Sequence, residues 1–118
     1  MTLRLGRLDG TVLGAALSFP DEVAALVLKA LATQVRFKDT DVIDLWRCLE
    51  LCTAAGATPD DFTKGEPETA KAIVRTLFAQ RNGIGMSSIV AEQRLSDRAA
   101  DQRFTRLRAL MSRIFGPS

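Results

Sequence analysis

The sequence contains no histidine and only two cysteines, and these shortages exclude several kinds of active site. Without histidine, the chain cannot supply a histidine general base, a histidine metal ligand, or the base of a Ser–His or Cys–His pair. Cys48 and Cys52 are four residues apart in a predicted helix, where the backbone geometry prevents a disulfide between them. Because there is no second cysteine pair, we interpret both as buried thiols rather than metal ligands, and we expect no metal site in this chain.

The sequence also lacks a long hydrophobic run and a strong charge of one sign. No stretch of about 18 residues is wholly apolar, so we expect no membrane span. The first ten residues, MTLRLGRLDG, lack the hydrophobic region of a signal peptide, and two reduced cysteines fit a cytoplasmic protein. The net charge of +2 is too small to predict nucleic-acid binding by itself.

What the sequence does contain fits one mainly α-helical domain over residues 1–118. Of its residues, 47% are apolar and 25% charged, which is ordinary for a chain with a single core. Residues 1–17 predict a small N-terminal β-hairpin, because apolar residues alternate loosely around the turn signal Asp9-Gly10. Residues 18–118 predict a four-helix domain. We expect its helices at about residues 20–35, from 39 or 40 to just before 56, 65–83 and 96–115, with a short helical turn after Thr58 and an ambiguous segment, either loop or short helix, at 84–95.

The stretch RFKDTDVIDLWRCLE, residues 36–50, places two aspartates on the apolar side of the predicted second helix. A buried carboxylate needs a partner, so Asp41 and Asp44 have either a structural or a functional role. The structural role would be helix capping together with an ion pair to Lys29 or Arg36. Because only a few residues join the first two helices, these helices should pack antiparallel and bring Lys29 within reach of Asp41 or Asp44.

The last predicted helix carries a group of arginines beside its apolar face. A functional interpretation is a surface that contacts successive phosphates of RNA. The alternative is a solvated face, partly neutralised by Asp97 and Asp101. The candidate nucleic-acid-binding residues are Arg98, Arg103, Arg106 and Arg113.

The segment VLKALATQVRFKDTDVIDLWRCL resembles a stretch near the end of AbiEii-type nucleotidyltransferases, the toxin components of bacterial toxin–antitoxin and abortive-infection pairs. In that family a lysine on an apolar helix is followed by an arginine and by an R/K-D-x-x-D-L helix start. The resemblance covers about residues 18–56, and Thr40 stands where a basic residue is usual. The matching residues are Lys29, Arg36, Asp41, Asp44 and Leu45.

The resemblance implies transfer of a nucleotide from a nucleoside triphosphate to an acceptor, which is tRNA in some members. It implies that Lys29 contacts phosphate, that Asp41 is a catalytic-site acid, and that Asp44 orients or pairs with a neighbour. The family's Mg²⁺ site, however, comes from an earlier Gly-Ser followed by a D-x-D strand, and this chain has no Gly-Ser. We therefore expect the C-terminal helical part of such an enzyme, inactive alone; Mg²⁺ and a nucleoside triphosphate are implied only for a complete enzyme.

Two other functions fit the same sequence: a small protein–protein interaction module, such as an antitoxin-like regulator, and an RNA-binding helical domain. If a catalytic half is absent, the hairpin and the almost wholly apolar first helix would be left uncovered. Monomers seldom expose large apolar patches. We therefore expect self-association, as a twofold dimer through residues 1–31, or binding of a separate N-terminal partner.

Overall fold

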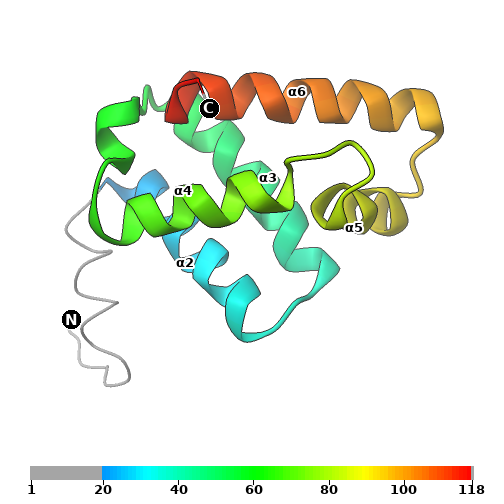
Figure 1. Ribbon diagram of the computed structural model, residues 1–118, viewed down its shortest axis with the longest axis horizontal. Coiled ribbons are helices and arrows are strands. Elements are labelled where there is room, and N and C mark those ends of the chain that lie inside the picture. The colour runs from blue at the N-terminus through cyan, green and yellow to red at the C-terminus, as the bar shows by residue number, and fades with distance from the viewer. Residues whose placement is uncertain (1–19, 118) are drawn as a thin grey trace.

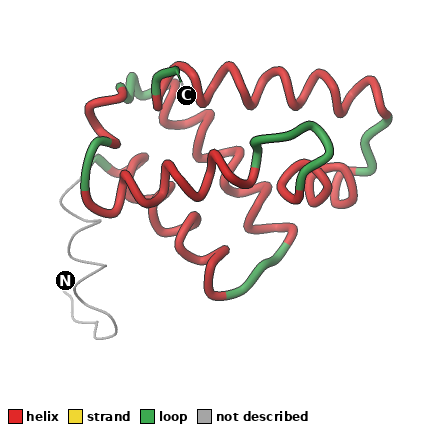
Figure 2. Tube along the Cα trace, viewed as in Figure 1, coloured by secondary structure: helices red, strands yellow, loops and turns green. Residues whose placement is uncertain are grey.

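The computed structural model describes residues 20–117, and within that range it contains five α-helices, one short 3₁₀ helix and no strand (Figures 1 and 2). The mainly helical fold class is thereby confirmed. The expected hairpin of residues 1–17 lies outside the described residues. The elements are α2 (Asp21–Val35), α3 (Asp39–Ala54), η1 (Pro59–Phe62), α4 (Gly65–Leu77), α5 (Ile84–Gln93) and α6 (Asp97–Phe115).

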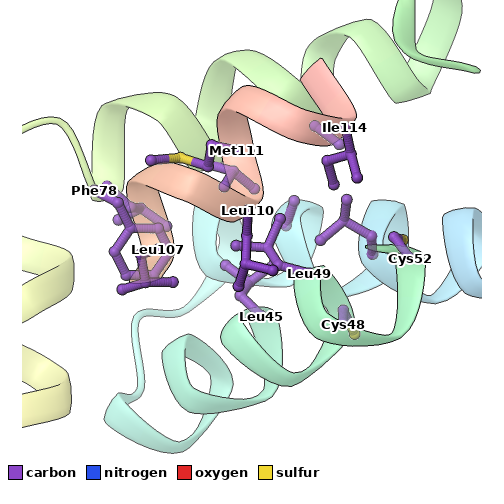
Figure 3. Packing of buried hydrophobic residues seen from close by; sticks show 14 of the residues in the cluster. Leu45, Cys48, Leu49, Cys52, Phe78, Leu107, Leu110, Met111 and Ile114 are labelled. Atoms are coloured by element: carbon purple, nitrogen blue, oxygen red, sulfur yellow. The ribbon is translucent and has the colours of Figure 1, made fainter. Parts of the chain in front are cut away.

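The helix α3 is the centre of this arrangement, since it packs against α2, α5 and α6. In Figure 1, α2 and the long α6 (orange to red) lie at opposite sides, with α3 between them. Figure 3 shows Leu110 of α6 reaching toward Leu45 and Leu49 of α3, while Leu107 lies beside Phe78. All five of these side chains are buried, so the α3–α6 contact forms much of one continuous apolar core.

The prediction of four helices is wrong by one, because residues 84–93 form the fifth helix α5. A glycine inside this segment weakens its helical signal. The structure explains that glycine: a Cβ atom on Gly85 would collide with the backbone carbonyl of Leu77 and lie 2.8 Å from Cδ1 of Phe78. Close packing of α5 against the end of α4 therefore requires glycine here and overrides local propensity.

Side-chain caps mark the start of η1 and of α6, two places where the sequence predicted helical segments to begin. At η1, Thr58 and Asp61 form a capping box around Pro59, with the Thr58 amide donating to Asp61 Oδ2 at 2.9 Å. At α6, the Ser96 hydroxyl accepts a hydrogen bond of 3.2 Å from the Ala99 amide. Among the described residues, no helix combines the length and hydrophobicity needed to cross a bilayer.

Candidate functional site

Lys29 of α2 lies between two carboxylates of α3. Its Nζ is 3.3 Å from Oδ1 of Asp41 and 2.8 Å from Oδ2 of Asp44. The two aspartates are three residues apart and therefore lie on one side of α3, so a single ammonium can reach both. The expectation that Lys29 would reach Asp41 or Asp44 is confirmed, since Lys29 contacts both carboxylates.

Asp41 is the buried member of this group, with 3% of its surface exposed. Its second oxygen, Oδ2, accepts a hydrogen bond of 3.3 Å from Nε of Arg36, so each carboxylate oxygen faces one cation. Burial alone would raise the pKa of Asp41, but the hydrogen bond from Lys29 and the charge of Arg36 outweigh burial and lower it. Asp41 therefore remains ionised and links α2 to the first turn of α3.

The capping part of the structural interpretation does not hold at the start of α3. The residue in the N-cap position is Lys38, and no side chain caps this end. Asp41 is the third residue of the helix, where a negative charge is favourable near the free backbone amides. Ion pairing to Lys29 and Arg36, rather than capping, explains why this carboxylate is tolerated inside the molecule.

Lys29 is a fixed positive charge rather than a base. The hydrogen bond that it donates to Asp44 raises the pKa of Lys29, and this effect exceeds the lowering caused by burial. The amine therefore stays protonated near neutral pH and is not available as a nucleophile or general base. Its side chain is 36% exposed, so its charge can still reach a ligand from solvent.

Asp44 is more accessible than Asp41, and its carboxylate is shared between Lys29 and Arg47. Its side chain is 36% exposed, and its Oδ1 lies 3.9 Å from Nη1 of Arg47, one turn along α3. We call Lys29, Arg36, Asp41, Asp44 and Arg47 the Lys29 cluster. With three cations and two carboxylates, the Lys29 cluster has one positive charge in excess.

The Lys29 cluster does not fit Mg²⁺. A divalent cation would need the space between Asp41 and Asp44, and the ammonium of Lys29 occupies that space. Within residues 20–117 there is also no group of three or more cysteine, aspartate or glutamate side chains placed to hold a metal ion. The cluster can therefore present positive charge to an anion through the accessible side of Lys29.

The structure divides the four candidate arginines of α6 into two pairs. Arg103 and Arg106 are committed to neighbouring helices. Nη1 of Arg103 donates to Oε1 of Gln93 at 2.6 Å, and Arg106 makes two hydrogen bonds to Glu50. Arg98 and Arg113 are exposed near opposite ends of α6. Arg106 is still 57% exposed despite its bonds to Glu50, so Arg98, Arg106 and Arg113 are accessible to solvent and Arg103 is the partly buried member of the set.

A network around Trp46 was not predicted from the sequence. The guanidinium of Arg103 lies 3.9 Å from the centre of the Trp46 ring, and Nε1 of Trp46 donates to Oε2 of Glu50 at 3.2 Å. Glu50 also accepts hydrogen bonds of 2.6 and 3.0 Å from Arg106, and these bonds lower the pKa of Glu50. The network joins α3 to α6. Only the i, i+4 spacing of Trp46 and Glu50 could have indicated part of it.

The two cysteines are buried thiols, as the sequence predicted. Sγ of Cys52 lies 3.3 Å from the carbonyl oxygen of Glu22, to which it donates. Burial raises the pKa of Cys52 to about 12 and also raises that of Cys48. Neither residue has the low pKa and exposure of a reactive cysteine.

Comparison with known proteins adds no relative to this description. No family model matches the sequence, and no curated protein or solved structure shows significant similarity to it. The observations that bear on function are therefore the geometry of the Lys29 cluster and the sequence pattern around it.

Proposed function

We propose that this chain is the C-terminal helical part of an AbiEii-type nucleotidyltransferase-like toxin and that it is inactive alone. In this proposal the Lys29 cluster supplies positive charge to a triphosphate site, and another part carries the metal-binding carboxylates. The observation that carries the proposal is the placement of Lys29 between Asp41 and Asp44. These are three of the residues that the sequence resemblance selects.

The exposure of the two aspartates supports a role in binding phosphate. Asp41 is buried and holds the Lys29 ammonium from one side, whereas Asp44, 36% exposed, holds it from the other. A phosphate oxygen could replace Asp44 as a partner of Lys29 while Asp41 keeps the ammonium in position. A positive charge that is already oriented stabilises negative charge on a phosphoryl group without first reorganising.

The same geometry supports the expectation that the chain does not catalyse transfer alone. Asp39-Thr40-Asp41 has D-x-D spacing, but it forms the first turn of α3. Asp41 is buried and already paired with Lys29 and Arg36, so it is not free to bind Mg²⁺. Nucleotidyl transfer therefore needs a metal site from elsewhere.

The test has two parts. The chain is incubated with labelled nucleoside triphosphates, Mg²⁺ and bulk tRNA, and we expect no labelled product. Amide chemical shifts are then followed during titration with the triphosphates. We expect chemical-shift changes around Lys29 that are lost in the Lys29→Gln variant. The control is Lys64→Gln, which removes the same charge from an exposed position and should keep these changes. Label incorporation abolished by Asp41→Asn would contradict the expected inactivity, and unchanged shifts around Lys29 would contradict phosphate binding there.

A second function, a helical protein–protein interaction module, is favoured by a different observation. Leu28 and Val35 of α2 are exposed although both are large and apolar. An antitoxin-like regulator would use such a surface for its partner. DNA sequence upstream of Met1 separates the two proposals, since an upstream reading frame with Gly-Ser followed by D-x-D is required by the first alone. Either protein would act in the cytoplasm, where its two thiols stay reduced.

A further inference from the structure

One side of α2 carries an apolar strip that the described residues leave uncovered. Its members recur with helical spacing and lie on one face of the helix. Leu28 is 41% exposed and Val35 is 88% exposed, whereas apolar side chains on the opposite face, such as Leu26 and Ala30, are fully buried. We call this surface the α2 strip; it consists of the exposed Leu28 and Val35 and the partly buried Ala25 and Ala32.

The α2 strip runs beside the Lys29 cluster. At about 100° per residue, Lys29 and Arg36 follow Leu28 and Ala32 around the helix, so they border the strip on one side. Phe37, two residues after the last residue of α2, is 42% exposed. A covering element would therefore bury exposed apolar side chains and lie next to the accessible charges of Lys29 and Arg36.

We infer that the α2 strip is the docking face for residues 2–17 of the same chain. This segment leads to Pro20, directly before α2, so it is attached at one end of the strip. The turn signal Asp9-Gly10 divides it into two halves of similar length. Seven extended residues span about 23 Å, and the fifteen residues of α2 span about 22 Å, so either half can follow the whole strip.

The composition of residues 2–17 matches the surface that it would cover. The segment contains six large aliphatic residues and few charges, and Asp9 is its only acidic residue. Such a segment has apolar area to bury, and the strip is the nearest exposed apolar surface along the chain. The short covalent connection to the first residue of α2 also favours an intramolecular contact over a contact with a second molecule. The aliphatic residues are Leu3, Leu5, Leu8, Val12, Leu13 and Leu17.

This inference does not rest on the proposed function, because it concerns only two segments of this chain. It is tested in the full chain by the rate at which a maleimide modifies a cysteine placed on the strip. Val35→Cys probes the strip, and Gln34→Cys is the matched control, since Gln34 is exposed on another side of α2. Cys48 and Cys52 are buried and form a slow background.

We expect Val35→Cys to react at least about tenfold more slowly than Gln34→Cys, at a rate ratio that does not change on dilution. Adding Leu5→Asp with Val12→Asp, or Leu8→Asp with Leu13→Asp, should raise the rate to that of the control in at least one case. Helical circular dichroism verifies that each variant is folded. Equal rates at both cysteines, protection that disappears on dilution, or protection that survives both aspartate pairs would overturn the inference; loss on dilution would instead indicate a second copy of the chain.

Discussion

Replacing Asp41 by asparagine tests whether the Lys29 cluster stabilises the junction of α2 and α3. The substitution keeps the size and shape of the side chain but removes its charge. The asparagine amide cannot accept from both Lys29 and Arg36 as the carboxylate does, because one of its terminal atoms is a donor. The contacts affected are those of 3.3 Å from Lys29 Nζ to Oδ1 and of 3.3 Å from Arg36 Nε to Oδ2.

The exposure of Lys29 and Arg36 determines how much stability Asp41→Asn removes. Breaking a fully buried ion pair costs about 3–5 kcal/mol, because an unpaired charge stays inside. Here Lys29 keeps Asp44, and Arg36 is 56% exposed and can be rehydrated. We therefore expect a loss of about 1–3 kcal/mol in the free energy of unfolding, within the range for hydrogen bonds to charged groups. In urea this corresponds to a midpoint lower by about 1 M.

The dependence on pH gives the prediction a second readout. The pKa of Asp41 is lowered in the folded protein, so its contribution to stability is present above the unfolded pKa of about 4. That contribution is lost as the pH falls through the lower folded pKa. We therefore expect the difference between the wild-type chain and Asp41→Asn to be constant near neutral pH and to shrink below about pH 4.

The matched control is Asp39→Asn, which removes the same charge from the same turn of α3. Asp39 makes no ion pair with the other residues that the structure describes, so its substitution measures only the effect of charge near the helix start. The reasoning is refuted if Asp41→Asn and Asp39→Asn have equal urea midpoints at pH 7. It is also refuted if the effect of Asp41→Asn persists undiminished at pH 2.

Three further outcomes follow from the structure. Asp44→Asn should change the free energy of unfolding by less than about 1 kcal/mol, because the partners of Asp44 are partly exposed. A loss of stability in urea as large as that of Asp41→Asn would contradict this expectation. Gly85→Ala should cost about 1–3 kcal/mol, since the new methyl group meets the carbonyl of Leu77, and an unchanged thermal midpoint would show that α5 can shift away. Cys48 and Cys52 should react with iodoacetamide at pH 8 far more slowly in the folded chain than in urea, because burial raises the pKa of both thiols. Mass spectrometry measures the alkylation, and equal rates in the folded and urea-unfolded chain would refute the burial of the two thiols.

The core of the candidate site could be predicted because it depends on local rules. The helical period puts Asp41 and Asp44 on one side of α3, and a three-residue link brings Lys29 opposite them. The signal came from placing polar residues on an otherwise apolar face, where each must find a partner.

The Trp46 network could not be predicted, because its partners are distant in sequence. Arg103 covers the Trp46 ring from a residue 57 positions later, and Arg106 reaches Glu50 from 56 positions later. Nothing local in α6 distinguishes these two arginines from Arg98 or Arg113. Only the packing of α6 on α3 decides which arginines bond to side chains of other helices.

The helix α5 was ambiguous for a different physical reason. Gly85 lowers helix propensity, and no periodic apolar stripe compensates for it in this segment. The structure shows that the glycine is required by the close approach to Leu77 and Phe78 rather than by a turn. Local preference and tertiary packing therefore disagree at this position, and packing prevails.

The two aspartates of the Lys29 cluster have different roles because of their burial, not their chemistry. Asp41 has both oxygens engaged and little access to water, so it holds Lys29 and Arg36 in place. Asp44 shares Lys29 but is partly exposed, so solvent reaches it more easily than Asp41. Because Lys29 and Asp44 are both partly exposed, the ammonium stays accessible on the side next to the α2 strip. If phosphate binds there as proposed, a segment that covers the α2 strip would exclude water and strengthen that interaction.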